Sequence, residues 1–149
     1  MNLKNLTICL TPSVLLGSTG TSWGGDYEKG LAAAQSGDFA TALREFRPLA
    51  EQGSVGAQFN LGVMYFNGEG VGEDIDQAIS WIEQAARQNM AIAQYTLGMF
   101  YQDGKVMQQD LESARHWLNQ AALNHSPEDG FLDDLTRRIK LLLTGSQDS

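Results

Sequence analysis

Cysteine is the scarcest residue of this 149-residue chain, which has a single one, Cys9. Cys9 lies in a leader-like segment that we expect to be removed, so the mature chain would have none. Disulfides, thiolate metal sites and cysteine catalysis are thereby excluded. No apolar run reaches the roughly 18 residues needed to cross a bilayer, so we expect no stable membrane insertion.

Positive charge is also scarce, with 10 Lys and Arg against 18 Asp and Glu and a formal net charge of −8. A phosphate backbone would be repelled by that field, so we expect no nucleic-acid partner. Histidine occurs only at His116 and His125, which form no zinc-site or triad pattern. The paired acids Glu73-Asp74 and Asp133-Asp134 stand where a helix start favours negative charge. We therefore predict no catalytic residue, no metal and no cofactor.

Residues 1–22 have the layout of a secretory signal peptide. Lys4 and the amino terminus carry the only positive charges, an apolar stretch runs from Leu6 to Leu16, and small residues crowd together from Gly17 to Ser22. We predict cleavage near Ser22 and a periplasmic or secreted mature protein. A disordered leader on a cytoplasmic protein is the alternative.

The rest of the chain has a globular composition and repeats itself after 36 residues. Residues 57–65, AQFNLGVMY, return as residues 93–101, AQYTLGMFY, and the same offset carries Trp81 onto Trp117. A fixed period of this size, with two helical patterns inside it, predicts an all-α solenoid, a right-handed superhelix of helix-turn-helix repeats.

One repeat domain is expected over residues 23–144, followed by a tail at 145–149. It comprises a helical pair at 26–53, repeats at 57–88 and 93–124, and a capping helix at 127–144. In the first pair, Gly37 and Asp38 are expected to close one helix and cap the next, and Pro48 to kink or shorten the second helix. The capping helix has one apolar stripe and one charged face, as the end of a solenoid requires.

The repeated residues resemble the pattern of the Sel1-like repeat (SLR) family, relatives of the tetratricopeptide repeat. The first copy matches it at Ala57, Leu61, Gly62, Tyr65, Gly68, Gly70, Val71, Asp74, Ala78, Trp81, Ala85 and Ala86. The second copy matches at Ala93, Leu97, Gly98, Tyr101, Gly104, Asp110, Ala114, Trp117, Ala121 and Ala122, and departs at Val106 and Met107 in the loop. The resemblance implies a non-catalytic adaptor or scaffold, often exported in bacteria.

Residues that recur most faithfully are interpreted as the structural frame, and those that differ between the copies as the source of specificity. In stacks of this kind the first helix of each pair faces the concave surface. The row predicted there to bind a protein or peptide is Glu28, Leu31, Gln35, Asn60, Val63, Asn67, Thr96, Met99 and Asp103. Solvent-exposed positions without a binding role are the alternative for this row.

Two other function classes stay open. One is an accessory protein or enzyme of the cell envelope that binds or acts on peptidoglycan or β-lactams, although the cysteine pairs of the relatives discussed in that role are missing here. The other is a purely structural subunit. The sequence gives neither the partner nor the oligomeric state.

Overall fold

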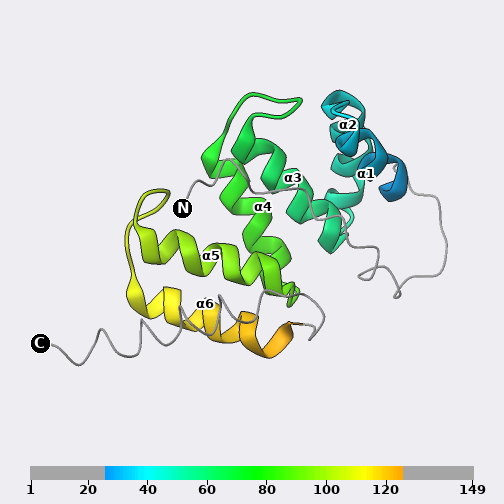
Figure 1. Cartoon of the computed structure of the whole chain (residues 1–149). Coiled ribbons are helices and arrows are strands. Elements are labelled where there is room, and N and C mark those ends of the chain that lie inside the picture. Colours follow the sequence, from blue (N-terminus) through cyan, green and yellow to red (C-terminus); the bar gives the residue numbers. More distant parts are fainter. Residues whose placement is uncertain (1–25, 126–149) are drawn as a thin grey trace, which may run out of the picture. The chain divides into compact units, whose positions relative to one another are not determined.

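The computed structural model describes residues 26–125, in which six α-helices follow one another as three helix-turn-helix pairs (Figure 1). The first pair is α1 (Tyr27–Gln35) and α2 (Phe39–Glu51), the second is α3 (Val55–Asn67) and α4 (Ile75–Arg87), and the third is α5 (Ala91–Asp103) and α6 (Leu111–Asn124). The chain divides into two compact units, one up to Gln84 and the other from Ala85, and each is described by itself.

Aspartates fix where the second helix of each pair begins. The carboxylate of Asp38 accepts a hydrogen bond from the backbone N–H of Thr41 at 3.1 Å, and that of Asp74 accepts one from Gln77 at 3.0 Å. In the second unit, Asp110 caps α6 in the same way. These bonds satisfy amides that have no partner inside the helix, so the cap predicted at Asp38 is confirmed, and Asp74 stands at a helix start as expected.

The two longer turns begin alike and then diverge. α3 ends at Gly68 and α5 at Gly104, both in the left-handed conformation, with φ of 70° and 64°. In the first turn Gly70 also has a positive φ, and a Cβ there would lie 2.6 Å from the carbonyl oxygen of Phe39. Val106 takes the place of Gly70 in the second turn and lacks a positive φ, so the departure from the repeat pattern changes the backbone path.

A glycine in the first helix of the pair brings α3 close to α4 and α5 close to α6. A Cβ on Gly62 would lie 2.7 Å from Cγ1 of Ile82, and one on Gly98 would lie 2.6 Å from Cγ of Leu118. Both glycines therefore allow α3 and α5 to approach the following helix more closely than any other residue would permit. The recurrence of glycine at these two positions of the repeat thus has a packing cause.

Pro48 does not end α2, which continues to Glu51. Within residues 26–125, no helix is long and apolar enough to cross a membrane. The predicted signal peptide at 1–22 and capping helix at 127–144 lie outside the described residues.

Candidate functional site

The predicted binding row divides into buried and accessible residues. Leu31, Asn60, Val63, Thr96 and Met99 are buried, with at most a few per cent of their surface exposed. The expectation that these five line an open groove is wrong, because a partner could not reach them in this structure. Helical phase cannot identify an open face here, because α3 and α5 are each buried over eight consecutive residues, 57–64 and 93–100.

Tyr27 explains why Asn60 is buried. The amide of Asn60 donates a hydrogen bond to the hydroxyl of Tyr27 at 3.3 Å, and Gly56, one turn earlier, has no side chain to hold the ring away. A Cβ on Gly56 would lie 2.5 Å from the Tyr27 hydroxyl. The ring of Tyr27 also packs on Phe46 with centroids 5.6 Å apart. Asn60 therefore holds α3 against α1 within the first unit.

Thr96 and Met99 have interior roles in the second unit. The hydroxyl of Thr96 donates to the carbonyl of Ile92 at 2.8 Å, which satisfies this buried group inside its own helix. Met99 belongs to an apolar cluster with Tyr95, Leu118 and Ala121, against which Ala122 packs. A substitution at either position would alter the packing of the interior and not an exposed surface.

Four members of the row remain accessible. Glu28 and Gln35 are exposed, and Asn67 and Asp103 are partly exposed. Gln35, Asn67 and Asp103 share one position in the architecture, because each is the last residue of the first helix of its pair. We call these three residues the helix-end set. Its members belong to the variable part of the row, so the set stays a prediction for partner contact.

Two glutamines have a structural role that the sequence reading missed. The side-chain amide of Gln58 donates to the carbonyl of Ala50 at 3.1 Å, and that of Gln94 donates to the carbonyl of Ala86 at 3.0 Å. Both glutamines are buried, and each reaches back eight residues to the helix before its own. The signal was available in the sequence, because Gln58 and Gln94 recur at the 36-residue period. We call these contacts the glutamine–alanine bonds.

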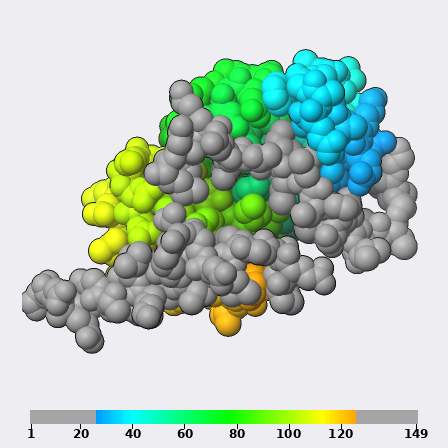
Figure 2. Space-filling model, in the orientation of Figure 1, coloured from blue at the N-terminus to red at the C-terminus, as the bar shows by residue number. Residues whose placement is uncertain are grey.

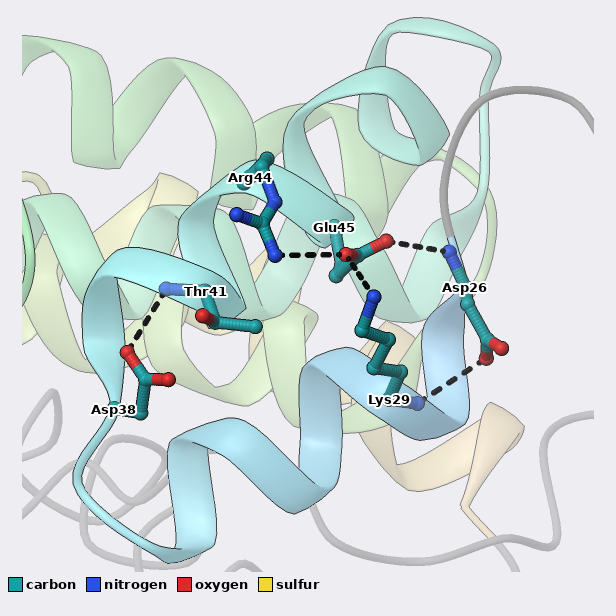
Figure 3. A network of polar contacts seen from close by, with 6 residues as sticks. All are labelled: Asp26, Lys29, Asp38, Thr41, Arg44 and Glu45. Atoms are coloured by element: carbon teal, nitrogen blue, oxygen red, sulfur yellow. Dashed lines mark hydrogen bonds and ion pairs between the residues drawn. The ribbon is translucent and has the colours of Figure 1, made fainter.

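A second polar network fixes the start of α1 (Figure 3). The carboxylate of Glu45, on α2, accepts a hydrogen bond from the backbone N–H of Asp26 at 3.2 Å and pairs with Lys29 at 3.0 Å and Arg44 at 3.5 Å. The hydrogen bond from Lys29 and that from Asp26 hold the pKa of Glu45 below its ordinary value. Glu45 is buried, so these partners compensate the desolvation of its charge.

The histidines have local contacts. The ring of His116 meets that of Trp117 edge to face at 5.4 Å, and Nδ1 of His125 lies 2.6 Å from the carbonyl oxygen of Ala122. Across residues 26–125, no three His, Cys, Asp or Glu side chains gather as a metal site. The two tryptophans of the repeat, Trp81 and Trp117, are partly buried beside Ala78 and Ala114, which are fully buried.

The Sel1 repeat family model matches residues 55–90 and 91–126. Among solved structures, a Sel1 repeat protein from Oxalobacter formigenes is 30% identical with a TM-score of 0.61, over 68% of this chain and 38% of its own. A protective antigen of uropathogenic Escherichia coli that displays an SLR fold is 29% identical with a TM-score of 0.66, over 78% of this chain and 24% of its own. This chain therefore spans well under half the length of either. None of the curated proteins matches it.

Proposed function

Because residues 55–126 are two Sel1 repeats and the chain belongs to the Sel1-repeat family, we propose that it is a non-catalytic adaptor that binds a protein or peptide partner. The fold is an α-solenoid of helix-turn-helix repeats, and Sel1-repeat proteins are generally protein-interaction scaffolds. The leader-like pattern of residues 1–22 supports a site of action in the cell envelope.

The observation that carries the proposal is the accessibility of the helix-end set. The faithfully repeated residues serve as caps, turns and close helix contacts, which leaves them little freedom to vary. Gln35, Asn67 and Asp103 occupy equivalent positions and differ in chemistry; Gln35 is exposed, and Asn67 and Asp103 are partly exposed, with the side-chain oxygen of Asn67 buried. Such residues can change with the partner at small cost to the fold. An amide and a carboxylate supply directional hydrogen bonds, which give specificity at a polar rim.

A pair of charge-matched double variants tests the assignment. The site variant carries Asn67→Arg and Asp103→Arg. The control carries Asn119→Arg and Asp76→Arg, which make the same chemical changes at exposed helix positions, again with one in each unit. Both variants gain the same charge, so a general electrostatic effect would appear in both.

Partners are captured from an envelope extract on immobilised protein and quantified by mass spectrometry, after circular dichroism has established that both variants are folded. We expect a partner retained by the wild type and the control to be lost from the site variant. Retention of every partner by the folded site variant would refute the assignment of the helix-end set as the binding site. If both variants lose the partner equally, the added positive charge is the cause, and the helix-end set is not the binding site.

A further inference from the structure

Asn67 ends α3 and is followed by Gly68, and the sequence has no other Asn-Gly pair. In such a pair the backbone nitrogen of glycine can attack the side-chain carbonyl carbon of asparagine, because glycine has no side chain to obstruct the approach. The new C–N bond closes a succinimide ring, and the side-chain nitrogen leaves as ammonia. Water then opens the ring at either carbonyl and gives aspartate or isoaspartate. The chemistry of deamidation therefore singles out Asn67 among the asparagines of the chain.

The last turn of α3 holds this pair in a closed conformation. The N–H of Gly68 donates to the carbonyl of Met64, and the N–H of Glu69 donates to the same carbonyl at 2.9 Å. The nitrogen that would attack is thus engaged in the helix end, and the peptide plane that carries it is fixed. This peptide must rotate before the nitrogen can reach the side chain of Asn67, and the rotation breaks both hydrogen bonds. Deamidation therefore requires the end of α3 to open.

The opening is local, because the bonds to be broken lie at the surface of the fold. Gly68 is exposed and Asn67 is partly exposed, and the turn that follows them belongs to the green surface in Figure 2. At the far end of this turn, the N–H of Asp74 donates to the carbonyl of Tyr65 at 3.0 Å and closes the turn on α3. Segments with few buried contacts open at a lower free-energy cost than the whole domain unfolds. The rate of deamidation should then follow the fraction of molecules in which this end is open.

Gly70 controls how firmly the turn is seated. It has a φ of 72°, and a Cβ there would lie 2.6 Å from the carbonyl oxygen and 3.0 Å from the Cβ of Phe39, at the start of α2. A side chain at position 70 would therefore strain the backbone and push the turn away from α2. Gly72 lies in the same turn without a positive φ, and a Cβ there meets no atom within 4 Å. Substitutions at these two glycines form a matched pair that leaves Asn67 and Gly68 intact.

The second repeat shows that aspartate fits the same helix end. Asp103 ends α5 and is followed by Gly104, whose φ of 64° is close to the 70° of Gly68. Conversion of Asn67 to aspartate would reproduce this pair in the first repeat. The amide side chain, which donates and accepts hydrogen bonds, would become a carboxylate that only accepts them. Isoaspartate adds a carbon atom to the backbone, so this product would disturb the helix end itself.

We propose that Asn67 is a deamidation site whose rate is set by opening of the α3 end, and that its conversion to aspartate changes the partner specificity of the helix-end set. Water is the only co-reactant that the covalent step needs. The first part of the proposal concerns the α3 end alone. The second part rests on the proposed function, because only a residue that contacts a partner can change specificity.

Peptide mapping of the full chain by mass spectrometry tests the first part. The chain is incubated in mildly alkaline buffer, either folded or unfolded in urea, and conversion at Asn67 is followed over time. We expect conversion in the folded chain to be at least about tenfold slower than in the unfolded chain, but faster than the global unfolding equilibrium alone would allow. Gly70→Ala should accelerate conversion in the folded chain about threefold or more, and Gly72→Ala should leave it unchanged.

Equal rates in the folded and unfolded wild type would overturn the first part, because the α3 end would then give Asn67 no protection. Slowing by the full equilibrium constant of unfolding, measured on the same protein by urea denaturation, would also overturn it, since only the unfolded chain would then react. Equal rates for Gly70→Ala and Gly72→Ala would exclude the turn from the control of opening. The two wild-type results need no substitution, so they decide the question even if Gly70→Ala unfolds the chain.

Asn67→Asp represents the aspartate product and tests the second part. Partners are captured again from an envelope extract, with Asn119→Asp as the control, because Asn119 is exposed on α6 and undergoes the same chemical change. We expect Asn67→Asp to change the capture of a partner about threefold, and Asn119→Asp to leave it unchanged. Unchanged capture by Asn67→Asp would overturn the second part. If the double variant with Asn67→Arg and Asp103→Arg also retained every partner, the binding role of the helix-end set would fail as well.

Discussion

Gly98 offers the sharpest test of the packing described above. A Cβ at this position would lie 2.6 Å from Cγ and 2.8 Å from Cδ2 of Leu118, and 3.3 Å from the carbonyl oxygen of Ala114. Leu118 is fully buried, so its side chain has little room to move aside. Overpacking of this kind costs about 1–3 kcal/mol. The higher helix propensity of alanine returns about 1 kcal/mol.

Gly98→Ala should therefore lower the free energy of unfolding by up to about 2 kcal/mol. The sign should reverse when the obstructing side chain is removed. In a Leu118→Ala background, which itself costs about 2–5 kcal/mol, Gly98→Ala should stabilise the protein by about 1 kcal/mol. The coupling free energy between Gly98→Ala and Leu118→Ala is the quantity of interest, since it separates the contact with Leu118 from the helix propensity of alanine.

Urea denaturation followed by circular dichroism measures all four members of this cycle. Gly72→Ala is the control, because a Cβ there meets no atom within 4 Å, and its effect should stay within about 0.5 kcal/mol. If Gly98→Ala stabilises the wild-type chain as much as the Leu118→Ala chain, a Cβ at position 98 does not clash with Leu118 and the reasoning fails.

Two further predictions concern pH and processing. The hydrogen bond from Ser113 lowers the pKa of Asp110, so the capping contribution of Asp110 is present above the ordinary carboxyl pKa and is lost as the pH falls through the lowered value. Below about pH 4, the unfolding free energy of the wild type should therefore fall more than that of Asp110→Ser. Parallel curves of unfolding free energy against pH for the two proteins would contradict this. For export, intact mass measurement of the protein from a periplasmic fraction should show a chain that begins near Trp23, and a full-length chain confined to the cytoplasm would contradict the signal peptide.

Much of the frame could be predicted from the sequence because its causes are local. An aspartate before an apolar periodic stretch has few roles other than a cap, and the structure places Asp38 and Asp74 in that role. A glycine that recurs inside a helix indicates close packing, which Gly62 and Gly98 show. Both conclusions depend only on neighbours within one turn or one repeat.

The accessibility of the binding row could not be predicted in the same way. Helical phase gives the direction in which Asn60 points, but not which side chain lies over it. That side chain is Tyr27, from the first pair, whose spacing differs from the 36-residue period. The polar side chains of Asn60 and Thr96 indicated exposure to solvent, whereas each donates to a hydrogen-bond acceptor within the protein. The role of Glu45 could not be predicted for the same reason, since two of its partners, Asp26 and Lys29, come from the start of the preceding helix.

The glutamine–alanine bonds also bear on how such a chain can lengthen. A segment from 55 to 90 contains its own donor, Gln58, and its own acceptor, the carbonyl of Ala86. A tandem duplication of that segment would thus carry both halves of the junction with it, and the new copy could join its neighbours without further substitution. Addition after Ala122 would meet a carbonyl engaged by His125. Growth by duplication is therefore easy in the interior of the gene and obstructed at the end of its second repeat.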